Sequence, residues 1–482
     1  MTVLRRLHPE RHALPGERLH ALVAALLPLR RCITGDGLRQ TLARLGAELG
    51  PAARLVQTEV PSGRAALDWK IPREWRVRRA FIETSAGRRY ADWDASPLHL
   101  VQYSRPARAW LPLDDLRPML HTLPEQPALV PYRTTYYAER WGFCLSHEAL
   151  TALEAEAGEA GMVLALVEAE LFAGALSFGE VVLPGESPDE VLLSAHACHP
   201  ALANDNCASL AVAVSLARLL AERPRRRLTY RFLFAPGTIG ALAWLAARPD
   251  VLPRLRYGLV LANLGDPGGL TYKRTRQDTF GEAVSGTDAC VAAALGDRAA
   301  YRPFDPFGYD ERQFGSPGFD LPVGRLTRTP HGEYPEYHTS ADDLSLVCPE
   351  ALADSLGALL RIVDAFEEAP LPPPRTPAIA AHLRAAAPPE AGALPHRRAR
   401  YVNAAPFGEP MLSRRGLLRT RGDAGDAADN AALLWLLALS DGTRSLEKVA
   451  ETAGLAPRVA ERAAARLLRA GLLRVLPAPN AP

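Results

Sequence analysis

The stretch that decides the fold is "EVLLSAHACHPALANDNCASLAVAVSLARLLAER", residues 190–223. It begins with a short apolar run that ends at His196, which is typical of a strand buried on both faces. A run with apolar residues at helical spacing closes it. Between the two runs lie histidines, cysteines and one aspartate flanked by asparagines. The stretch therefore predicts a buried strand that delivers polar side chains to the loop before a helix.

The same alternation continues further along the chain. The apolar runs in "RLTYRFLFAPG", "RYGLVLANLG" and "FDLPVGRLT" are typical of strands, and helical spacing is found in "GALAWLAARP", "GTDACVAAALGDR" and "PEALADSLGALLRIVDAFEEA". Strands that alternate with helices predict an α/β fold, with a mostly parallel sheet flanked by helices.

The flanking segments differ in composition from this core. Residues 1–50 have a helical pattern and belong with the core, whereas short aromatic strands predict a small inserted β-rich domain at 51–125. The α/β domain proper is expected at 126–368. A Pro- and Ala-rich linker at 369–400 follows, and three helices with a short apolar tail predict a winged helix at 401–482.

Composition excludes several classes of protein. The chain has 482 residues, 48% of them apolar and 23% charged, as in a globular protein of several domains. A net charge of +2 gives no electrostatic argument for binding nucleic acid or membrane. The six cysteines are scattered, no signal peptide is evident, and no apolar run reaches the roughly 18 residues of a membrane span. We therefore expect a cytoplasmic protein with reduced thiols.

Two polar clusters are candidates for chemistry. His196 and Asp205 come from the carboxyl end of one strand, where α/β sheets bind ligands, and they suit zinc. A capping aspartate and a structural histidine would give the same pattern. Cys198 and Cys207 are either further ligands or small apolar packing residues. In "TPHGEYPEYHTSADDLSLV", His338 lies among carboxylates that orient its ring, that begin a helix, or that do both.

These motifs resemble those of a known superfamily. "SAHACHPALANDNCAS" and "YHTSADD" are similar to the opening and closing motifs of the co-catalytic zinc exopeptidases, which include aminopeptidases. "GYDERQFGSPGFDLPV" resembles a third segment of that superfamily. "GRAALDWKIPREW", "PYRTTYYAERWGFCLS" and "LALSDGTRSLEKVA" are similar to a bacterial branch with an inserted β-domain and a C-terminal winged helix. The resemblance runs from about residue 60 to about residue 460.

The resemblance implies metal ligands at particular positions. It makes His196 and His338 zinc ligands and Asp205 a carboxylate shared by two metals. The remaining aspartate ligand falls on Asp266, one residue out of register. The alternative for Asp266 is a turn residue before Pro267.

The sequence also departs from the superfamily pattern. A pair of glutamates, one the general base and one a zinc ligand, is replaced by Gly237 and Thr238. The aspartate that orients the first histidine is replaced by Cys198, and His199 becomes an alternative ligand. With these groups missing, we expect one zinc ion, held by His196, Asp205 and either Asp266 or His338.

Several residues are candidates for handling the substrate. Glu311 lies in a segment that borders the active site of related enzymes, so we predict it as the catalytic base; the alternative is a surface salt bridge with Arg312. Its neighbours Tyr309 and Asp310 are predicted to bind substrate. So is Arg133, whose aromatic-rich segment could equally pack between domains.

The winged helix points to protein rather than DNA partners. Four arginines lie on its last helix, at 458, 462, 466 and 469, but neighbouring acids offset them. We therefore expect little binding to nucleic acid and a protein-interaction role.

The sequence as a whole predicts a zinc-dependent, aminopeptidase-like hydrolase of a small peptide or amide, in polysaccharide or specialised-metabolite biosynthesis. The alternatives are a non-hydrolytic metal-binding or interaction protein on the same fold, and a ligand-sensing winged-helix regulator. The oligomeric state stays open, a homo-oligomer included.

Overall fold

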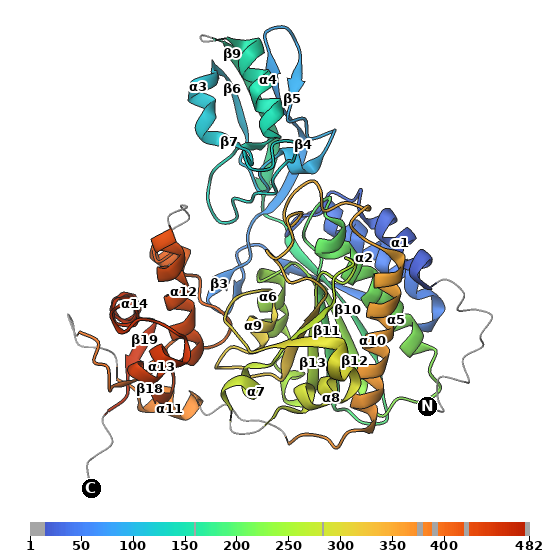
Figure 1. The fold of residues 1–482 in the computed structure, drawn as a ribbon, viewed down its shortest axis with the longest axis vertical. Helices are drawn as coiled ribbons and strands as arrows, with labels where there is room; N and C mark the ends of the chain where they lie inside the picture. The colour runs from blue at the N-terminus through green and yellow to red at the C-terminus, as the bar shows by residue number, and fades with distance from the viewer. Residues whose placement is uncertain are drawn as a thin grey trace.

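A computed structural model gives the architecture in three parts, which Figure 1 shows as a large α/β body, a projecting β-rich domain and a C-terminal helical domain. The structure describes residues 15–158, 161–281, 284–373, 379–387, 394–418 and 424–477.

The core of the α/β body is a sheet with eight strands in the described part of the chain. Its order is β1 (Leu55–Pro61), β10 (Ala175–Leu183), β12 (Thr229–Ala235), β11 (Glu190–His196), β13 (Leu255–Leu261), β16 (Val323–Thr327), β14 (Leu270–Lys273) and β15 (Ala299–Arg302). The central strands β12, β11, β13 and β16 are parallel, and antiparallel pairs lie on both sides of them. The expected α/β fold is confirmed, with a mixed sheet.

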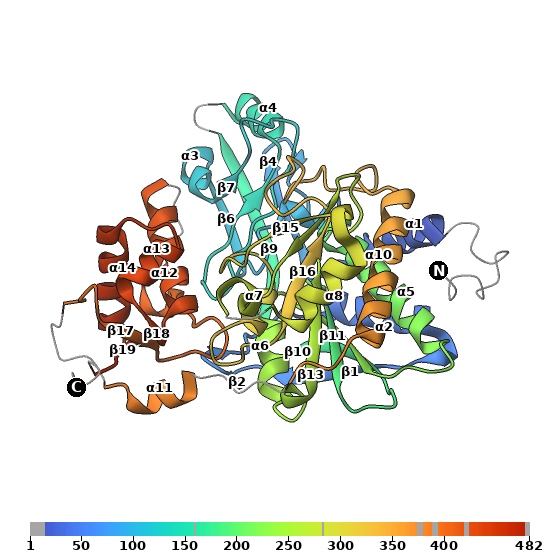
Figure 2. The same cartoon turned by 60° about the horizontal axis from the view of Figure 1, so that its bottom comes forward.

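Helices cover both faces of this sheet because its strands are apolar on both faces. Along β11, Val191 and Leu193 pack into one core cluster, whereas Leu192 packs into another. The first cluster is formed with α1 (Pro15–Leu26), α2 (Asp36–Leu49), α5 (Ser209–Ala221), α8 (Gly286–Leu295) and α10 (Pro349–Glu368). The second cluster includes α6 (Ile239–Ala247) on the opposite face. Figures 1 and 2 show this three-layer arrangement.

The projecting domain has a four-stranded antiparallel sheet whose boundaries differ from the expected 51–125. Its strands are β5 (Arg89–Tyr90), β4 (Glu74–Thr84), β9 (Met162–Phe172) and β6 (Ala107–Pro112), with α3 (Leu113–Leu116) and α4 (His147–Ala157) beside them. Residues 55–61 pair with β10 and belong to the large sheet. Residues 162–172, expected in the α/β domain, pair with β4 instead. Because β9 and β10 have the same continuous apolar pattern, the sequence does not show that they belong to different sheets.

The C-terminal domain has the expected winged-helix fold. It contains β17 (Arg400–Asn403), α12 (Ala424–Leu439), β18 (Asp441–Ser445), α13 (Leu446–Thr452), α14 (Pro457–Arg469) and β19 (Leu473–Val475), with strand order β18-β17-β19. The expected linker at 369–400 includes α11 (Ile379–Ala385), which touches β18 through His382 Nδ1 and the carbonyl oxygen of Asp441, 2.8 Å apart. Residues 374–378 and 388–393 of that linker lie outside the described residues.

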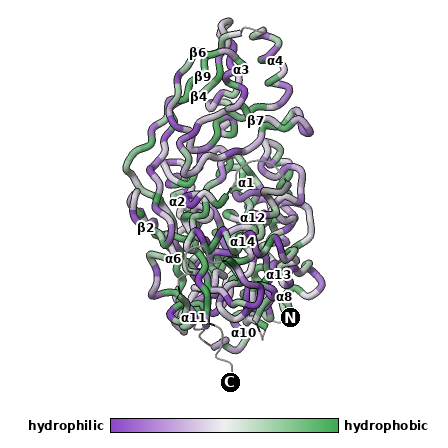
Figure 3. Tube along the Cα trace, turned by 90° about the vertical axis from the view of Figure 1, so that its left-hand side faces the viewer, coloured by the Kyte–Doolittle hydropathy of each residue, from purple (hydrophilic) through white to green (hydrophobic). Residues whose placement is uncertain are grey.

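Hydropathy varies over short distances along the chain. Figure 3 shows hydrophilic and hydrophobic segments interspersed along the trace. Among the described residues, no helix combines the length and the apolar character needed to cross a bilayer.

Two arginines of α14 form hydrogen bonds or ion pairs within the domain. Arg462 Nη2 lies 3.3 Å from Asp429 Oδ1. Arg466 Nη2 donates to the carbonyl oxygen of Leu417 at 2.6 Å, and its Nη1 lies 3.7 Å from Asp429 Oδ2. Two of the four arginines therefore already have protein partners.

We predict weak binding to duplex DNA. With Arg462 and Arg466 engaged, fluorescence anisotropy at physiological salt should give a Kd weaker than about 1 μM for a random-sequence duplex. The same titration at low salt controls for non-specific attraction. Nanomolar binding to one sequence at physiological salt would contradict this prediction.

Candidate metal centre

The candidate site lies at the carboxyl end of the central parallel strands. His196 is the last residue of β11, and Asp205 lies in the turn that leads into α5. Asp342 fixes that turn, because its Oδ1 accepts from the backbone N–H of Asn204 at 2.6 Å and its Oδ2 from that of Asp205 at 3.1 Å. Asp342 therefore does not begin a helix, which was one alternative for its segment; α10 begins at Pro349.

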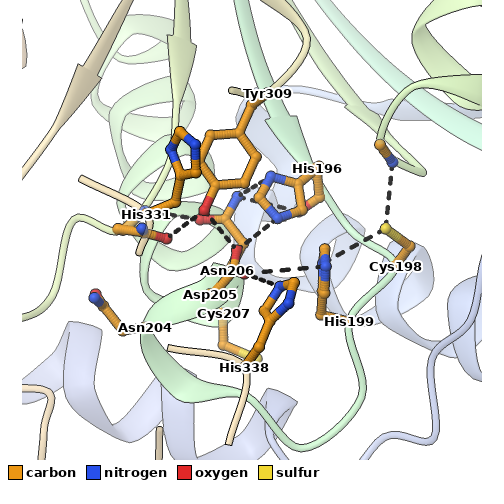
Figure 4. A network of polar contacts seen from close by, with 12 residues as sticks. His196, Cys198, His199, Asn204, Asp205, Asn206, Cys207, Tyr309, His331 and His338 are labelled. Atoms are coloured by element: carbon orange, nitrogen blue, oxygen red, sulfur yellow. Dashed lines mark hydrogen bonds and ion pairs between the residues drawn. The ribbon is translucent and has the colours of Figure 1, made fainter. Parts of the chain in front are cut away.

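Asp205 is the centre of the site. Its carboxylate is fully buried. Oδ1 lies 2.8 Å from His196 Nε2, and Oδ2 lies 3.1 Å from His338 Nε2 and 4.0 Å from His199 Nε2. Figure 4 shows the three imidazoles arranged around this one carboxylate. The loop before α10, which carries His338, thus meets the loop after β11 here.

The donor set suits a zinc ion. One ligand atom from each of His196, His199 and Asp205 lies within 4.8 Å of the others, and His338 faces the second oxygen of the same carboxylate. Imidazole nitrogens and a carboxylate oxygen are the ligands that zinc takes in catalytic sites. Of the residues predicted from sequence, the structure brings together His196, Asp205 and His338, with the alternative ligand His199 beside them.

The surroundings of Asp205 and His199 favour the protonation states in which these two groups can bind a metal ion. Burial alone would raise the pKa of Asp205, but His199, His196 and His338 outweigh it and hold that pKa well below its usual value. Burial lowers the pKa of His199 to about 3, although the charge of Asp205 opposes this. An ionised carboxylate beside a neutral imidazole is ready to coordinate, because neither has to lose a proton first.

Asn206 orients the first histidine. Its Nδ2 lies 3.1 Å from His196 Nδ1 and 3.2 Å from the carbonyl oxygens of both His196 and Leu261. This role was not predicted from the sequence. The one signal for it was the position of Asn206 next to Asp205. Cys198 Sγ accepts from the backbone N–H of Gly237 at 3.3 Å and lies 3.6 Å from His199 Nδ1. It packs against the ligand loop and does not join the ligand group.

The structure does not bring Asp266 to the ligand group. Its carboxylate accepts hydrogen bonds from Thr329 Oγ1 at 2.6 Å, from the backbone N–H of Gly268 at 2.9 Å and from Asn204 Nδ2 at 3.1 Å. Asn263 lies nearer the site: its Oδ1 is 3.2 Å from Tyr309 Oη, which is 3.4 Å from Asp205 Oδ1. Asp266 is therefore a turn residue, the alternative that the sequence left open.

Glu311 is a structural ion-pair residue, which corrects its prediction as the base. It is fully buried, and its Oε1 lies 2.9 Å from Lys273 Nζ and 3.1 Å from Arg325 Nη1. Burial would raise the pKa of Glu311, but these two cations lower it to about 2. A carboxylate this acidic is a poor proton acceptor near neutral pH. Arg312, its predicted partner, pairs with Glu409 instead.

Asp310 is the carboxylate beside the turn where the superfamily has its glutamate pair. Its Oδ1 accepts from the backbone N–H of Thr238 at 2.6 Å, and burial raises its pKa to about 6. Thr238 has a φ of 59°, which is costly for a β-branched residue, so this hydrogen bond holds a strained turn. A Cβ at Gly237 would lie 3.8 Å from that of His196. The turn that Asp310 holds thus lies beside His196.

Of the predicted substrate-binding residues, Tyr309 contacts the ligand group and Arg133 does not. The ring of Tyr309 stacks on His196 at 4.7 Å between centroids, so Tyr309 belongs to the site. The side chain of Arg133 is exposed, and the structure gives it no contact with the ligand group. Its neighbour Tyr132 is buried instead, with its ring 5.2 Å from His199 and 5.0 Å from His338. The aromatic segment therefore packs behind the ligands.

This fold, an aminopeptidase-like α/β body with a C-terminal winged helix, is shared with known proteins. A zinc aminopeptidase from Bacillus subtilis, 12% identical, matches 73% of this chain and 94% of its own with a TM-score of 0.52. A Clostridium acetobutylicum crystal structure named as a peptidase, 33% identical, matches 96% of both chains with a TM-score of 0.68.

Sequence comparison places the chain more narrowly. Residues 20–369 match the model of a family described as a domain of unknown function (DUF4910), and residues 399–475 match a winged helix-turn-helix model. A Clostridium acetobutylicum protein is 35% identical over 465 residues, 96% of this chain and 97% of its own. Its name assigns it to polysaccharide biosynthesis and gives it an aminopeptidase-like domain. The chain belongs to the DUF4910 family.

We predict that Glu311→Gln destabilises the fold without removing metal. The change removes the buried carboxylate from Arg325 and from Lys273, which keeps only Asp305, and should cost about 3 kcal/mol of unfolding free energy in urea titrations. The wild-type stabilisation should be lost as pH falls from 4.5 toward about 2, because the folded pKa lies below the usual value.

The matched control is Glu333→Gln, which removes the half-exposed pair with Arg302 and should cost less than about 1 kcal/mol. A Glu311→Gln protein that keeps its stability but loses bound zinc would contradict the structural role.

Proposed function

We propose that this protein is a zinc-dependent hydrolase of a small peptide or amide, and that it holds one zinc ion through His196, His199 and Asp205. The observation that carries the proposal is the convergence of these three ligand atoms within 4.8 Å around a buried, ionised carboxylate. His338, on the other oxygen of Asp205, is the fourth group available to the ion.

Two substitutions favour one ion over two. Thr238 replaces a ligating glutamate, and Asn263 rather than an aspartate lies next to Tyr309 and Asp205. A hydroxyl and an amide are weaker zinc ligands than carboxylates. The remaining strong donors belong to Asp205 and the three histidines, which suffice for a single catalytic zinc with an open position.

In this proposal the residues of the chain have separate roles. Bound zinc supplies Lewis acidity and lowers the pKa of water toward 7. Asp205 and the histidines hold the ion, Asn206 fixes the ring of His196, and Tyr309 packs over that ring. We assign proton transfer to Asp310: it takes a proton from the attacking water and passes it to the departing amine. Its raised pKa of about 6 suits both halves of that task.

The setting of the reaction is also a proposal. The relative from Clostridium acetobutylicum carries a name from polysaccharide biosynthesis, which supports a small amide or N-acyl substrate from a biosynthetic route. All six cysteines are free thiols in the structure, in keeping with a cytoplasmic enzyme.

One observation favours a second candidate, a metal-binding protein without hydrolytic activity. Gly237 and Thr238 offer no group that can accept a proton. Metal binding without turnover of any amide would support this candidate. A winged-helix regulator is favoured less, because Arg462 and Arg466 are already engaged with the rest of the domain.

Zinc content tests the site. Protein purified without chelator should carry one zinc ion per chain by plasma mass spectrometry. Asp205→Ala should abolish zinc retention, because Asp205 contacts every histidine of the group, whereas Thr238→Ala should leave it unchanged. Two zinc ions per chain, or an Asp205→Ala protein that keeps its zinc, would contradict the proposal.

Asp310→Asn tests the assignment of proton transfer. On a panel of aminoacyl and N-acetyl p-nitroanilides, kcat should fall about 100-fold or more while zinc content stays the same. The wild-type rate should rise as pH increases through about 6, where Asp310 ionises. Asp343→Asn, an exposed change near His338, is the control and should have little effect. An unchanged kcat in Asp310→Asn would assign the proton to another group.

A further inference from the structure

One short helix links the candidate site to the winged-helix domain. Tyr309 and Asp310 directly precede α9 (Glu311–Phe314), and Arg312 lies within it. Tyr309 approaches Asp205, and Asp310 accepts from the Thr238 N–H. Arg312 points the other way and pairs with Glu409 of the C-terminal part of the chain. Contacts with the metal centre and with the C-terminal domain are thus two residues apart.

The C-terminal side of this link is built from several contacts. Besides the ion pair, the backbone N–H of Glu409 donates to Gln313 Oε1 at 2.7 Å, and that of Gly408 donates to Ser316 Oγ at 2.9 Å. The backbone N–H of Gly318 donates to the carbonyl oxygen of Pro406 at 2.8 Å. The segment after β17 therefore lies along the whole of α9 and the turn that follows it.

We infer that Glu409 is a positioning residue: through Arg312 it holds α9 in the place where Tyr309 faces Asp205 and Asp310 supports Thr238. The winged-helix domain would then complete the catalytic site of its own chain. The effect on turnover rests on the proposed function, whereas the effect on the loop does not.

The physical reason is that α9 cannot fix its own position. A helix of four residues has no stability of its own, so contacts at its ends must hold it. Glu311 anchors it on one side to Lys273 and Arg325. On the other side the Arg312–Glu409 pair is largely buried, with 19% and 15% of the two side chains exposed. Charge-assisted bonds at such sites are stronger than those on the surface.

The domain interface offers a matched control. Asp68 also joins the α/β body to the same C-terminal segment, with Oδ2 2.6 Å from Arg415 Nη1 and 2.8 Å from the backbone nitrogen of Met411. Within the described part of the chain, Asp68 forms no hydrogen bond or ion pair with α9, and its carboxylate makes at least as many bonds as that of Glu409. A general weakening of the interface would therefore appear in Asp68→Ala, whereas a specific effect on the site requires Glu409.

Hydrogen–deuterium exchange of the full-length protein gives the direct test. The readout is the Thr238 amide, whose N–H donates to Asp310, with the amide of Leu193 in β11 as the reference. Glu409→Ala should speed exchange at Thr238 at least about tenfold, the effect of losing a charge-assisted hydrogen bond. Asp68→Ala should leave Thr238 unchanged, as should the reversed pair of Arg312→Glu with Glu409→Arg.

The outcomes separate clearly. Faster exchange at Thr238 in Glu409→Ala alone, with Leu193 unchanged and recovery in the reversed pair, supports the inference. No change in Glu409→Ala, or an equal change in Asp68→Ala, overturns it. These results need neither zinc nor substrate, so they stand whether or not the chain proves to be a hydrolase. If it hydrolyses a p-nitroanilide, Glu409→Ala should lower kcat about tenfold with little change in KM, as expected of a positioning defect.

Discussion

The constraint on which this structure depends is the burial of one negative charge. Asp205 is taken wholly out of water, which is costly unless partners compensate. Three imidazoles lie around its oxygens, and Asp342 holds the backbone nitrogens of its turn. These partners come from segments far apart in the sequence, so the fold must bring the loop after β11 and the loop before α10 together. A cation at this point would complete the compensation.

The departures from the superfamily change the charge of the centre more than its shape. With Thr238 in place of a glutamate and the amide of Asn263 beside Tyr309, Asp205 is the carboxylate that the three histidines share. A divalent ion held there would keep more of its positive charge, which strengthens its polarisation of a carbonyl. The same change removes anionic groups that could attract a substrate ammonium. In the proposed mechanism the proton is exchanged by Asp310, which is buried beside the altered turn.

The sequence predicted what depends on local pattern and left open what depends on single-residue geometry. The buried run before His196 and the helical run after it define the core, because the first is continuously apolar and the second has apolar residues at helical spacing. The change of sheet between β9 and β10 was not predicted, because both strands have the same apolar pattern. Asp266 was predicted as a ligand and Glu311 as the base, whereas Asn263 and Asp310 lie nearer the site, because a turn just after a strand or before a helix decides which residue faces it. Such turns leave little trace in residue spacing.

Ion pairs join the winged-helix domain to the α/β body. Its last helix uses Arg462 and Arg466 inside the domain, while Arg276 of the body joins Asp441 at 2.8 Å. Buried and half-buried pairs of this kind are lost together when a domain is removed, because each leaves an uncompensated charge behind. The two domains are therefore coupled through their electrostatics, and the turn that carries Tyr309 and Asp310 directly precedes the helix whose Arg312 takes part in that coupling.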